Sequence, residues 1–590
     1  MKHLKIYLIC LIIFTTQSIV HAQNQERYNL GFDHYDSINQ PMPSGWYNWG
    51  NFKKVSGEKL ESGEYVGKVV SDKDGKFGTV TYRIPANYAG DTVTLTGRVK
   101  HENVKGYVGL FMRIDGNNGI LGFNSMQKLK IQGTKDWKEY SIKLPLPSTA
   151  KAIYVAGILG GKGTAWFDDF RVSIDGKDLQ TLEETPKTYL KDFNTDTFNA
   201  ALDQSSTPID LTTKDALSSS MDGLIESLGD KKIVAIGEST HGTSEFYQLR
   251  EIITKRLIEE KGYNLVVLES PYDDIEFLNK GLSERPLDSL MKKHLFSIYQ
   301  TQEMKSFLEW YKNNRSDYNI KFKGSDDSFW VSNELLTDNI GVVNDQELNQ
   351  LLAMLKSNIA KGAKAKGKKE LKTNVAIYDN LVLIGKQLES TENLSDRLKE
   401  ILFNGKSTLI NYVNLSDKKP IQSRDEIMAD RISYLAKNQN NKIIVWAHNA
   451  HISKQVIVDN EIGIMGRDLA EEFGDDYHSI GLATLEGGYS FIEERLINGD
   501  HNYSEILKQS ELQSTKIPLW ENSLASYGND FYLDFSMLKK ELNTDEIIGS
   551  TRLIGYGPET KMDIYPLQLI KAFDALIFIK KTSATKPLRD

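Results

Sequence analysis

The sequence predicts two fold classes in one chain, an all-β sandwich followed by an α/β domain with a parallel or mixed sheet. Short alternating runs between Gly, Asp and Asn turns dominate the N-terminal part, and apolar strands joined by amphipathic helices dominate the rest. With 590 residues, the chain also exceeds the size of one ordinary core. We expect a β-sandwich over residues 24–176, a linker over residues 177–192 and the α/β domain over residues 193–590.

The first residues have the pattern of a secretory signal peptide. Lys2 and Lys5 precede an apolar run over residues 6–14, and Val20-His21-Ala22 offers small residues for cleavage. This apolar run is too short to cross a membrane. We therefore expect residues 1–22 to be a signal peptide and the mature protein to be exported, either to the periplasm or out of the cell.

Composition excludes several classes of site and partner. Cys10 is the only cysteine and lies inside the predicted signal, so the mature chain has no thiol for a nucleophile, a thiolate metal site or a disulfide. The net charge of −8 gives no electrostatic reason to expect nucleic acid as a partner. No other stretch has the roughly 18 apolar residues of a spanning helix, so we expect no membrane span.

Five runs in the N-terminal part alternate apolar and polar residues as half-buried strands do. They cover residues 79–83, 93–99, 107–114, 152–158 and 164–172. Short strands at regular spacing are typical of a sandwich, and we expect a jelly roll.

Within the last run, Trp166-Phe167-Asp168-Asp169-Phe170 resembles the final strand of carbohydrate-binding jelly-roll modules. That resemblance implies a glycan partner, bound through exposed aromatic side chains such as Trp46, Tyr47 and Trp49. The alternative is that these aromatics fill the core of the module, which then only aids folding.

The α/β part is predicted from four near-continuous apolar strands and the helices that follow them. The strands cover Ile233–Ile236, Leu265–Leu268, Lys442–Trp446 and Ala575–Ile579, with helices over residues 244–260 and 275–282. Residues 344–435 are strongly helical in pattern, with an interruption at residues 360–369. Because this segment falls between two strands, we expect a helical insertion over the site, and we hypothesise that it is a lid that selects substrate.

Ionisable side chains follow three of these strands directly. Glu238 and His241 follow the first strand, Glu269 the second, and His448 and His451 the third. Ligands of open α/β sheets bind beyond the carboxyl ends of the strands, so we expect these five residues to share one crevice. Eight histidines lie outside the predicted signal, and three of them fall at these strand ends. Two carboxylates and three imidazoles together favour proton-transfer chemistry.

The turn after the first strand permits other interpretations. Gly237-Glu238-Ser239-Thr240-His241 is one residue away from the nucleophile elbow G-x-S-x-G, which would make Ser239 the nucleophile of a serine hydrolase. Against this, a histidine fills the position of the last glycine. In a purely structural interpretation, Gly237 and Gly242 allow a tight turn, and Ser239 or Thr243 caps the helix that follows.

At these residues the sequence resembles the erythromycin esterase family. The segment 234–246, with Arg250 after it, is similar to the opening motif of that family, and Trp446–His451 is similar to its second histidine motif. Glu269 matches the acidic position between the two motifs. Three further segments support the similarity, namely residues 423–429, 464–469 and 573–576.

The resemblance implies an esterase that hydrolyses a macrolide lactone or a related carboxylic ester without a covalent intermediate. In that mechanism His241 is the general base that takes a proton from water. Glu238 and Glu269 would orient His241 and raise its basicity. His448 and His451 would polarise the carbonyl or protonate the leaving alkoxide.

Arg250 is predicted to bind substrate by stabilising the oxyanion, or else to hold a carboxylate of the site in place. The resemblance implies no cofactor and no metal. A metal-dependent hydrolase is the alternative, because His241, Glu269, His448 and His451 have the donor atoms that bind zinc or manganese.

The domain organisation leaves the class of substrate open. An exported enzyme with an extra sandwich module fits a small-molecule macrolide, and it fits an ester of the cell envelope or of a glycan equally well. A third alternative is a non-catalytic glycan-binding protein whose α/β domain has lost activity.

Overall fold

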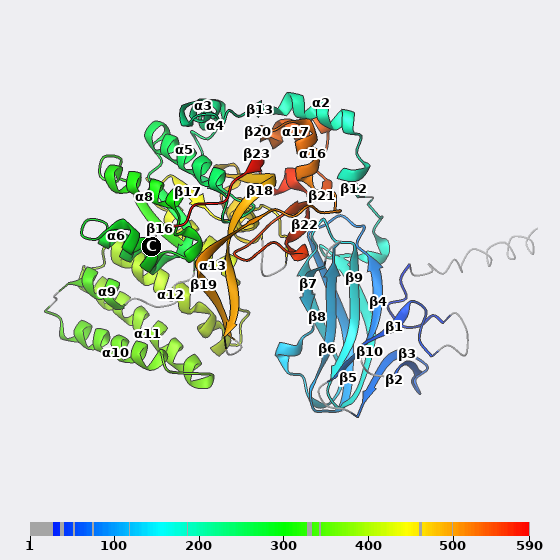
Figure 1. Cartoon of the computed structure of the whole chain (residues 1–590). Helices are drawn as coiled ribbons and strands as arrows, with labels where there is room; N and C mark the ends of the chain where they lie inside the picture. Colours follow the sequence, from blue (N-terminus) through cyan, green and yellow to red (C-terminus); the bar gives the residue numbers. More distant parts are fainter. Residues whose placement is uncertain are drawn as a thin grey trace, which may run out of the picture. The chain divides into compact units, whose positions relative to one another are not determined.

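The computed structural model describes residues 27–588 except for 36–40, 51–53, 73–75, 117–118, 186, 327–332, 342–343, 459–462 and 498–499. The predicted signal peptide lies outside the described residues. The chain forms two compact units that divide near Lys187, and each is described by itself (Figure 1). Among the described residues, no helix is both long and apolar enough to cross a membrane.

The first unit is a sandwich of two antiparallel sheets, which confirms the predicted all-β module. One sheet has the order β1-β4-β9-β6-β7 and the other β2-β3-β10-β5-β8, with β11 on the edge of β10. The strands are β1 (Trp46–Gly50), β2 (Lys54–Lys59), β3 (Tyr65–Ser71), β4 (Phe77–Pro85), β5 (Thr92–Val104), β6 (Tyr107–Asp115), β7 (Ile120–Asn124), β8 (Gly133–Pro145), β9 (Ala152–Gly160), β10 (Gly163–Ile174) and β11 (Lys177–Asp178).

One of the three aromatic residues predicted to bind glycan, all of them in strand β1, is not exposed. Successive side chains of a strand point to opposite faces, so Trp46 turns into the sandwich while Tyr47 and Trp49 turn outward. Trp46 is buried, stacks on Phe32 and donates its indole N–H to the carbonyl of Asn29. Trp46 is therefore a core residue and was wrongly predicted to be exposed.

The predicted linker is not bare chain. It holds the short strands β11 and β12 (Thr188–Tyr189) and two 3₁₀ turns, Leu179–Thr181 and Leu190–Asp192. Strand β12 joins β21 (Ile547–Arg552) and β22 (Ile564–Leu567) in a small three-stranded sheet.

The second unit is built on a mixed sheet with the order β13-β20-β23-β18-β14-β17-β15-β16, which confirms the predicted α/β class. Strands β14 to β18 and β23 run parallel to their neighbours in this order, and β20 joins β23 and β13 antiparallel. The strands are β13 (Ser206–Pro208), β14 (Ile233–Ile236), β15 (Leu265–Pro271), β16 (Lys321–Asp326), β17 (Ile443–Trp446), β18 (Tyr477–Ile497), β20 (Asp530–Asp534) and β23 (Ala575–Thr582). Strand β18 extends past the sheet and pairs with β19 (Asp500–Glu511).

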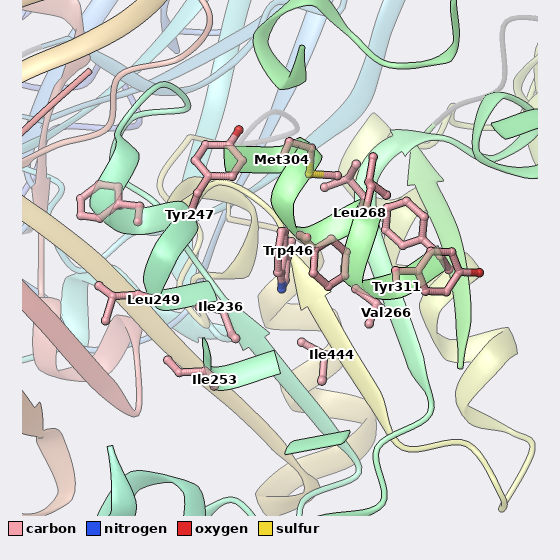
Figure 2. Packing of buried hydrophobic residues seen from close by; sticks show 14 of the residues in the cluster. Ile236, Tyr247, Leu249, Ile253, Val266, Leu268, Met304, Tyr311, Ile444 and Trp446 are labelled. Atoms are coloured by element: carbon pink, nitrogen blue, oxygen red, sulfur yellow. The ribbon is translucent and has the colours of Figure 1, made fainter. Parts of the chain in front are cut away.

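Helices cover both faces of this sheet, as continuous apolar strands require. On one face, Ile236, Leu268 and Trp446 pack against α5 (Ser244–Lys261) and α8 (Gln302–Asn314) (Figure 2). Their neighbours in sequence point to the other face and pack in a cluster that includes residues of several helices. These include α2 (Thr195–Ser205), α13 (Arg424–Ala436), α15 (Met465–Phe473) and α17 (Phe535–Leu542).

The predicted helical insertion has two parts that pack differently. Helices α10 (Gln346–Gly362), α11 (Lys368–Ser390) and α12 (Asp396–Ser416) lie together (Figure 1). They share an apolar cluster with α9 (Asn333–Ile340), which ends before the predicted start of the insertion at residue 344. Helix α13 belongs instead to the core beneath the sheet, because Met428 and Ile432 pack with strand residues. The gap between α10 and α11 falls at the predicted interruption.

Candidate active site

Glu238 and His241 lie in the tight turn that follows β14, and other segments of the chain pack closely against this turn. A Cβ at Gly237 would lie 1.9 Å from Oδ1 of Asn449, and one at Gly242 would lie 2.0 Å from the carbonyl oxygen of Ser490. Only glycine fits at either position, so the chain can turn sharply before α5 begins. The turn brings Oε1 of Glu238 within 2.8 Å of Nδ1 of His241. The pairing fixes the proton of His241 on Nδ1.

Arg250 lies behind Glu238 and is completely buried. Its Nη1 pairs with Oε2 of Glu238 at 2.8 Å, and its Nη2 donates to the carbonyl oxygens of Ile236 and Ala447. The predicted substrate-binding role does not fit this burial, because the guanidinium faces protein groups. The other predicted role, holding a carboxylate in place, matches the geometry.

His241 is buried between aromatic rings. Tyr556 stacks on its face, with ring centroids 4.4 Å apart and planes 9° apart, and His448 lies at 4.9 Å. Tyr247 donates its hydroxyl to the carbonyl of His241 and steadies the turn. The second ring nitrogen, Nε2, has no hydrogen-bond partner within the described part of the chain. With Nδ1 protonated, Nε2 carries a lone pair that can accept a proton.

Glu269, at the end of β15, contacts the other two histidine positions rather than His241. Its Oε2 accepts the backbone N–H of His448 at 2.9 Å, and its Oε1 lies 3.3 Å from Nε2 of His451. Arg424 donates to the same Oε1 at 2.9 Å. Burial alone would raise the pKa of Glu269, but His451 and Arg424 outweigh it and hold that pKa well below its usual value. Glu269 is therefore an anion.

His451 lies between two carboxylates. Its Nδ1 is 2.6 Å from Oδ1 of Asp425, and its Nε2 faces Glu269. Burial opposes the positive charge, but Glu269 and Asp425 together raise the pKa of His451 to about 10. Asp425 is held in turn by the backbone N–H groups of Ile464 and Met465. His451 is thus a cation at neutral pH, with both ring nitrogens occupied.

His448 is neutral and bound to backbone through both ring nitrogens. Its Nδ1 accepts the N–H of Ala450, and its Nε2 donates to the carbonyl of Ile554 at 3.1 Å. Burial, with His241 beside it, lowers the pKa of His448 well below its usual value. The five strand-end residues do lie together, as predicted, but only His241 offers a free ring nitrogen.

The structure adds residues that no sequence motif had marked as part of the site. Arg424 forms a bidentate pair with Asp326 and also binds Glu269. Asp326 and Glu269 both lie at the edge of the sheet where the parallel strands end. The stacked Tyr556 and the edge-on Tyr299 complete the walls around His241. Asp326 ends β16, so the strand-end rule would have found it if that strand had been recognised.

The geometry of the site does not match either of two alternatives, a metal-dependent hydrolase or a serine hydrolase. Within the described residues, no three His, Cys, Asp or Glu side chains form a group that could hold a metal ion. The ring nitrogens of His448 and His451 face protein groups. The Oγ of Ser239 is buried and has no hydrogen-bond partner among these residues, so it is not paired with a histidine as a serine nucleophile requires.

The family model for erythromycin esterase matches residues 258–582, more than half of the chain. The chain belongs to the erythromycin esterase family. The matched range includes Glu269, His448 and His451 and begins after His241. As a member of this family, the protein is a hydrolase that acts on ester bonds.

Known relatives match about two thirds of the chain. The chain is 23% identical over 398 residues to an erythromycin esterase type II of Escherichia coli, which spans 61% of this chain and 91% of the relative. A solved Bacillus cereus protein matches 67% of this chain and all of its own, with a TM-score of 0.55 and 22% identity. A solved succinoglycan biosynthesis protein covers 66% of this chain and 98% of its own, with a TM-score of 0.53 and 19% identity. These two solved proteins share the fold of this chain's α/β unit.

Proposed function

We propose that this protein hydrolyses a carboxylic ester, a macrolide lactone or a related ester, with water activated by His241. The observation that carries the proposal is the free Nε2 of His241 opposite the Glu238 pairing at Nδ1. A neutral imidazole whose Nδ1–H is held by a carboxylate is a general base at neutral pH. Arg250 fixes Glu238, and Tyr556 fixes the plane of the ring.

Charges around the base support the same assignment. His451 and Arg424 neutralise Glu269 and Asp326 on one side of the site, so His241 faces a network whose charges are already paired. Neutral His448 ties the segment that carries Tyr556 to the strand ends through its bond to Ile554. We assign His448 and His451 to positioning, in place of the predicted contact with substrate.

The proposal is tested by incubating the protein with erythromycin in ¹⁸O-water and following the mass of the drug. Uptake of one labelled water, lost in His241→Ala and kept under a chelator, supports the mechanism. Loss under the chelator favours the metal-dependent alternative, and labelling of Ser239 by a fluorophosphonate favours the serine hydrolase. If erythromycin stays intact, the same assay with acetylated glycans tests envelope esters as substrate.

We further infer that the sandwich binds a glycan, because its outer face carries aromatic side chains. Trp49 lies edge-on to Phe111 and Tyr154, with the guanidinium of Arg113 over its ring, and Phe123 beside them is half exposed. Sugar rings stack on aromatic faces of this kind. Together with the signal pattern at residues 1–22, this suggests an exported enzyme that acts near glycans.

The helices α9–α12 are proposed to select the substrate. They are joined to the strand ends through a clasp, defined as Tyr272, Glu276, Lys323, Arg397 and Glu400. Lys323 of β16 binds Glu276 at 2.8 Å and Glu400 of α12 at 2.6 Å, and Arg397 also binds both carboxylates. The clasp thus holds α12 against β16 and the helix that follows β15, and we propose that the substrate contacts this side of the site.

A further inference from the structure

Tyr299 carries a hydroxyl that the described residues leave without a hydrogen-bond partner. The side chain is 0% exposed, so solvent does not supply the missing bond. Buried polar groups in native proteins are hydrogen-bonded in the great majority of cases. An exception at a candidate active site points to a partner that comes from a ligand.

The ring of Tyr299 packs against the catalytic candidate His241. Tyr299 ends the 3₁₀ turn η4 (Ser297–Tyr299), and its ring lies edge-on to His241, with centroids 6.5 Å apart and planes at 83°. Burial raises the pKa of Tyr299 well above its usual value, and Tyr556, Glu269 and Glu238 raise it further. The phenol therefore keeps its proton at neutral pH and can act as a hydrogen-bond donor.

Two serines near the strand ends, Ser239 and Ser270, also have buried hydroxyls without partners. A serine Oγ can change partner by rotation about one bond. The oxygen of Tyr299 is fixed in the plane of a packed ring and cannot be turned toward backbone. Of the three hydroxyls, that of Tyr299 is therefore the one held in a fixed position, where it can donate to an acceptor on a ligand.

We propose that Tyr299 is a further catalytic residue, whose hydroxyl donates a hydrogen bond to the substrate carbonyl oxygen as it becomes an oxyanion. The inference rests on the proposed function. Water oxygen bonds to the carbonyl carbon, its proton passes to Nε2 of His241, and the carbonyl π electrons move to the oxygen that Tyr299 binds. On collapse, the bond to the alkoxide breaks and the alkoxide takes the proton from His241. Acid and alcohol are the products.

This arrangement follows the general logic of oxyanion stabilisation. Donors that are fixed before the reaction stabilise the developing charge without reorganising, and removal of one donor typically lowers kcat by about 10²–10³-fold. A neutral phenol near two carboxylates suits this role, because it gives a hydrogen bond without adding charge to the free site.

The test compares Tyr299→Phe with Tyr263→Phe in the full chain, with p-nitrophenyl acetate as substrate. Tyr263 is equally buried, but its hydroxyl donates to the carbonyls of Leu228 and Lys231 away from the site. We expect Tyr299→Phe to lower kcat about 10²-fold with KM within about twofold, and to melt no earlier than wild type. Tyr263→Phe should keep kcat and melt earlier.

Two outcomes overturn the inference. One is a Tyr299→Phe protein with the kcat of wild type. The other is a melting temperature lowered as far as in Tyr263→Phe, which would show that the hydroxyl has a partner within the chain. The kinetics of His241→Ala separate this failure from that of the proposed function. Activity that depends on His241 and not on Tyr299 overturns only the inference, whereas a wild type without esterase activity overturns both.

Discussion

After β14, His241 binds the protein through one ring nitrogen, whereas after β17, His448 and His451 bind it through both. The two regions have similar composition and lie at the same edge of the sheet. They differ in what surrounds them, since His241 meets one carboxylate and aromatic rings, and His451 meets two carboxylates. Proximity to the site therefore does not make a histidine a general base. A free nitrogen does.

The largest effect expected from this difference is on turnover. His241→Ala should lower kcat about 10³-fold, because general-base assistance contributes about 10²–10⁴-fold. The melting temperature should fall as well, because the substitution removes the bond to Glu238 and the stacking on Tyr556, so kcat is measured at a temperature where both proteins are folded. Steady-state kinetics and thermal melting measure the two quantities. His294→Ala, which removes a buried histidine outside the site, is the control and should keep kcat.

In the region after β17, His451 should affect the free energy of unfolding more than turnover. The pKa of His451 is about 10 in the folded chain and near 6.5 in an unfolded one, so its stabilisation is complete below about pH 6.5. It is lost as pH rises through about 10. We expect the free energy of unfolding to fall over that window by on the order of a few kcal/mol, and the fall to shrink in His451→Gln. Equal pH dependence in both proteins would contradict the ion pairing.

The clasp extends the comparison to the helical insertion. Glu400→Gln weakens the bonds from Lys323 and Arg397 while it keeps the shape of the side chain. We expect a loss of about 1–3 kcal/mol in stability and a raised KM for erythromycin, with kcat changed less than in His241→Ala. Urea unfolding and steady-state kinetics measure these. Lys399→Gln, in an exposed pair on the same helix, is the matched control and should leave both unchanged.

The smallest effect on catalysis is expected from the sandwich. Trp49→Ala should leave ester hydrolysis within about twofold of wild type, because general acid–base chemistry needs groups within hydrogen-bond reach. It should weaken retention on a column of immobilised polysaccharide. Trp46→Ala gives the contrast, since the loss of a buried indole should lower the melting temperature of the sandwich. Retention that is unchanged in Trp49→Ala would count against the aromatic surface.

How far the sequence predicts this structure depends on the signal that each element carries. Continuous apolar runs such as Ile233–Ile236 predict buried strands, so the strand-end residues could be found without a structure. Strand β16 was missed because Lys321 and Lys323 interrupt its apolar pattern, and Asp326 was missed with it. Lys323 is tolerated there because the clasp pairs its charge.

The roles of the histidines were beyond the sequence for a different reason. Whether a ring nitrogen is free depends on contacts between distant segments, such as His448 with Ile554 and His451 with Asp425. Tyr299 and Tyr556 lie in segments without periodic pattern, where no strand or helix signal marks them. Trp46 shows the same limit, because alternation along a strand gives two faces without saying which one is buried.

The role of His241 as the base is tested most directly by rescue of glycine variants with imidazole, with p-nitrophenyl acetate as substrate and the rate of imidazole alone subtracted. His241→Gly removes the base and leaves space for a small imidazole beside the substrate. Added imidazole should restore activity to His241→Gly in a saturable manner and should restore none to His451→Gly. Rescue of His451→Gly, with His241→Gly as active as wild type, would contradict this role of His241.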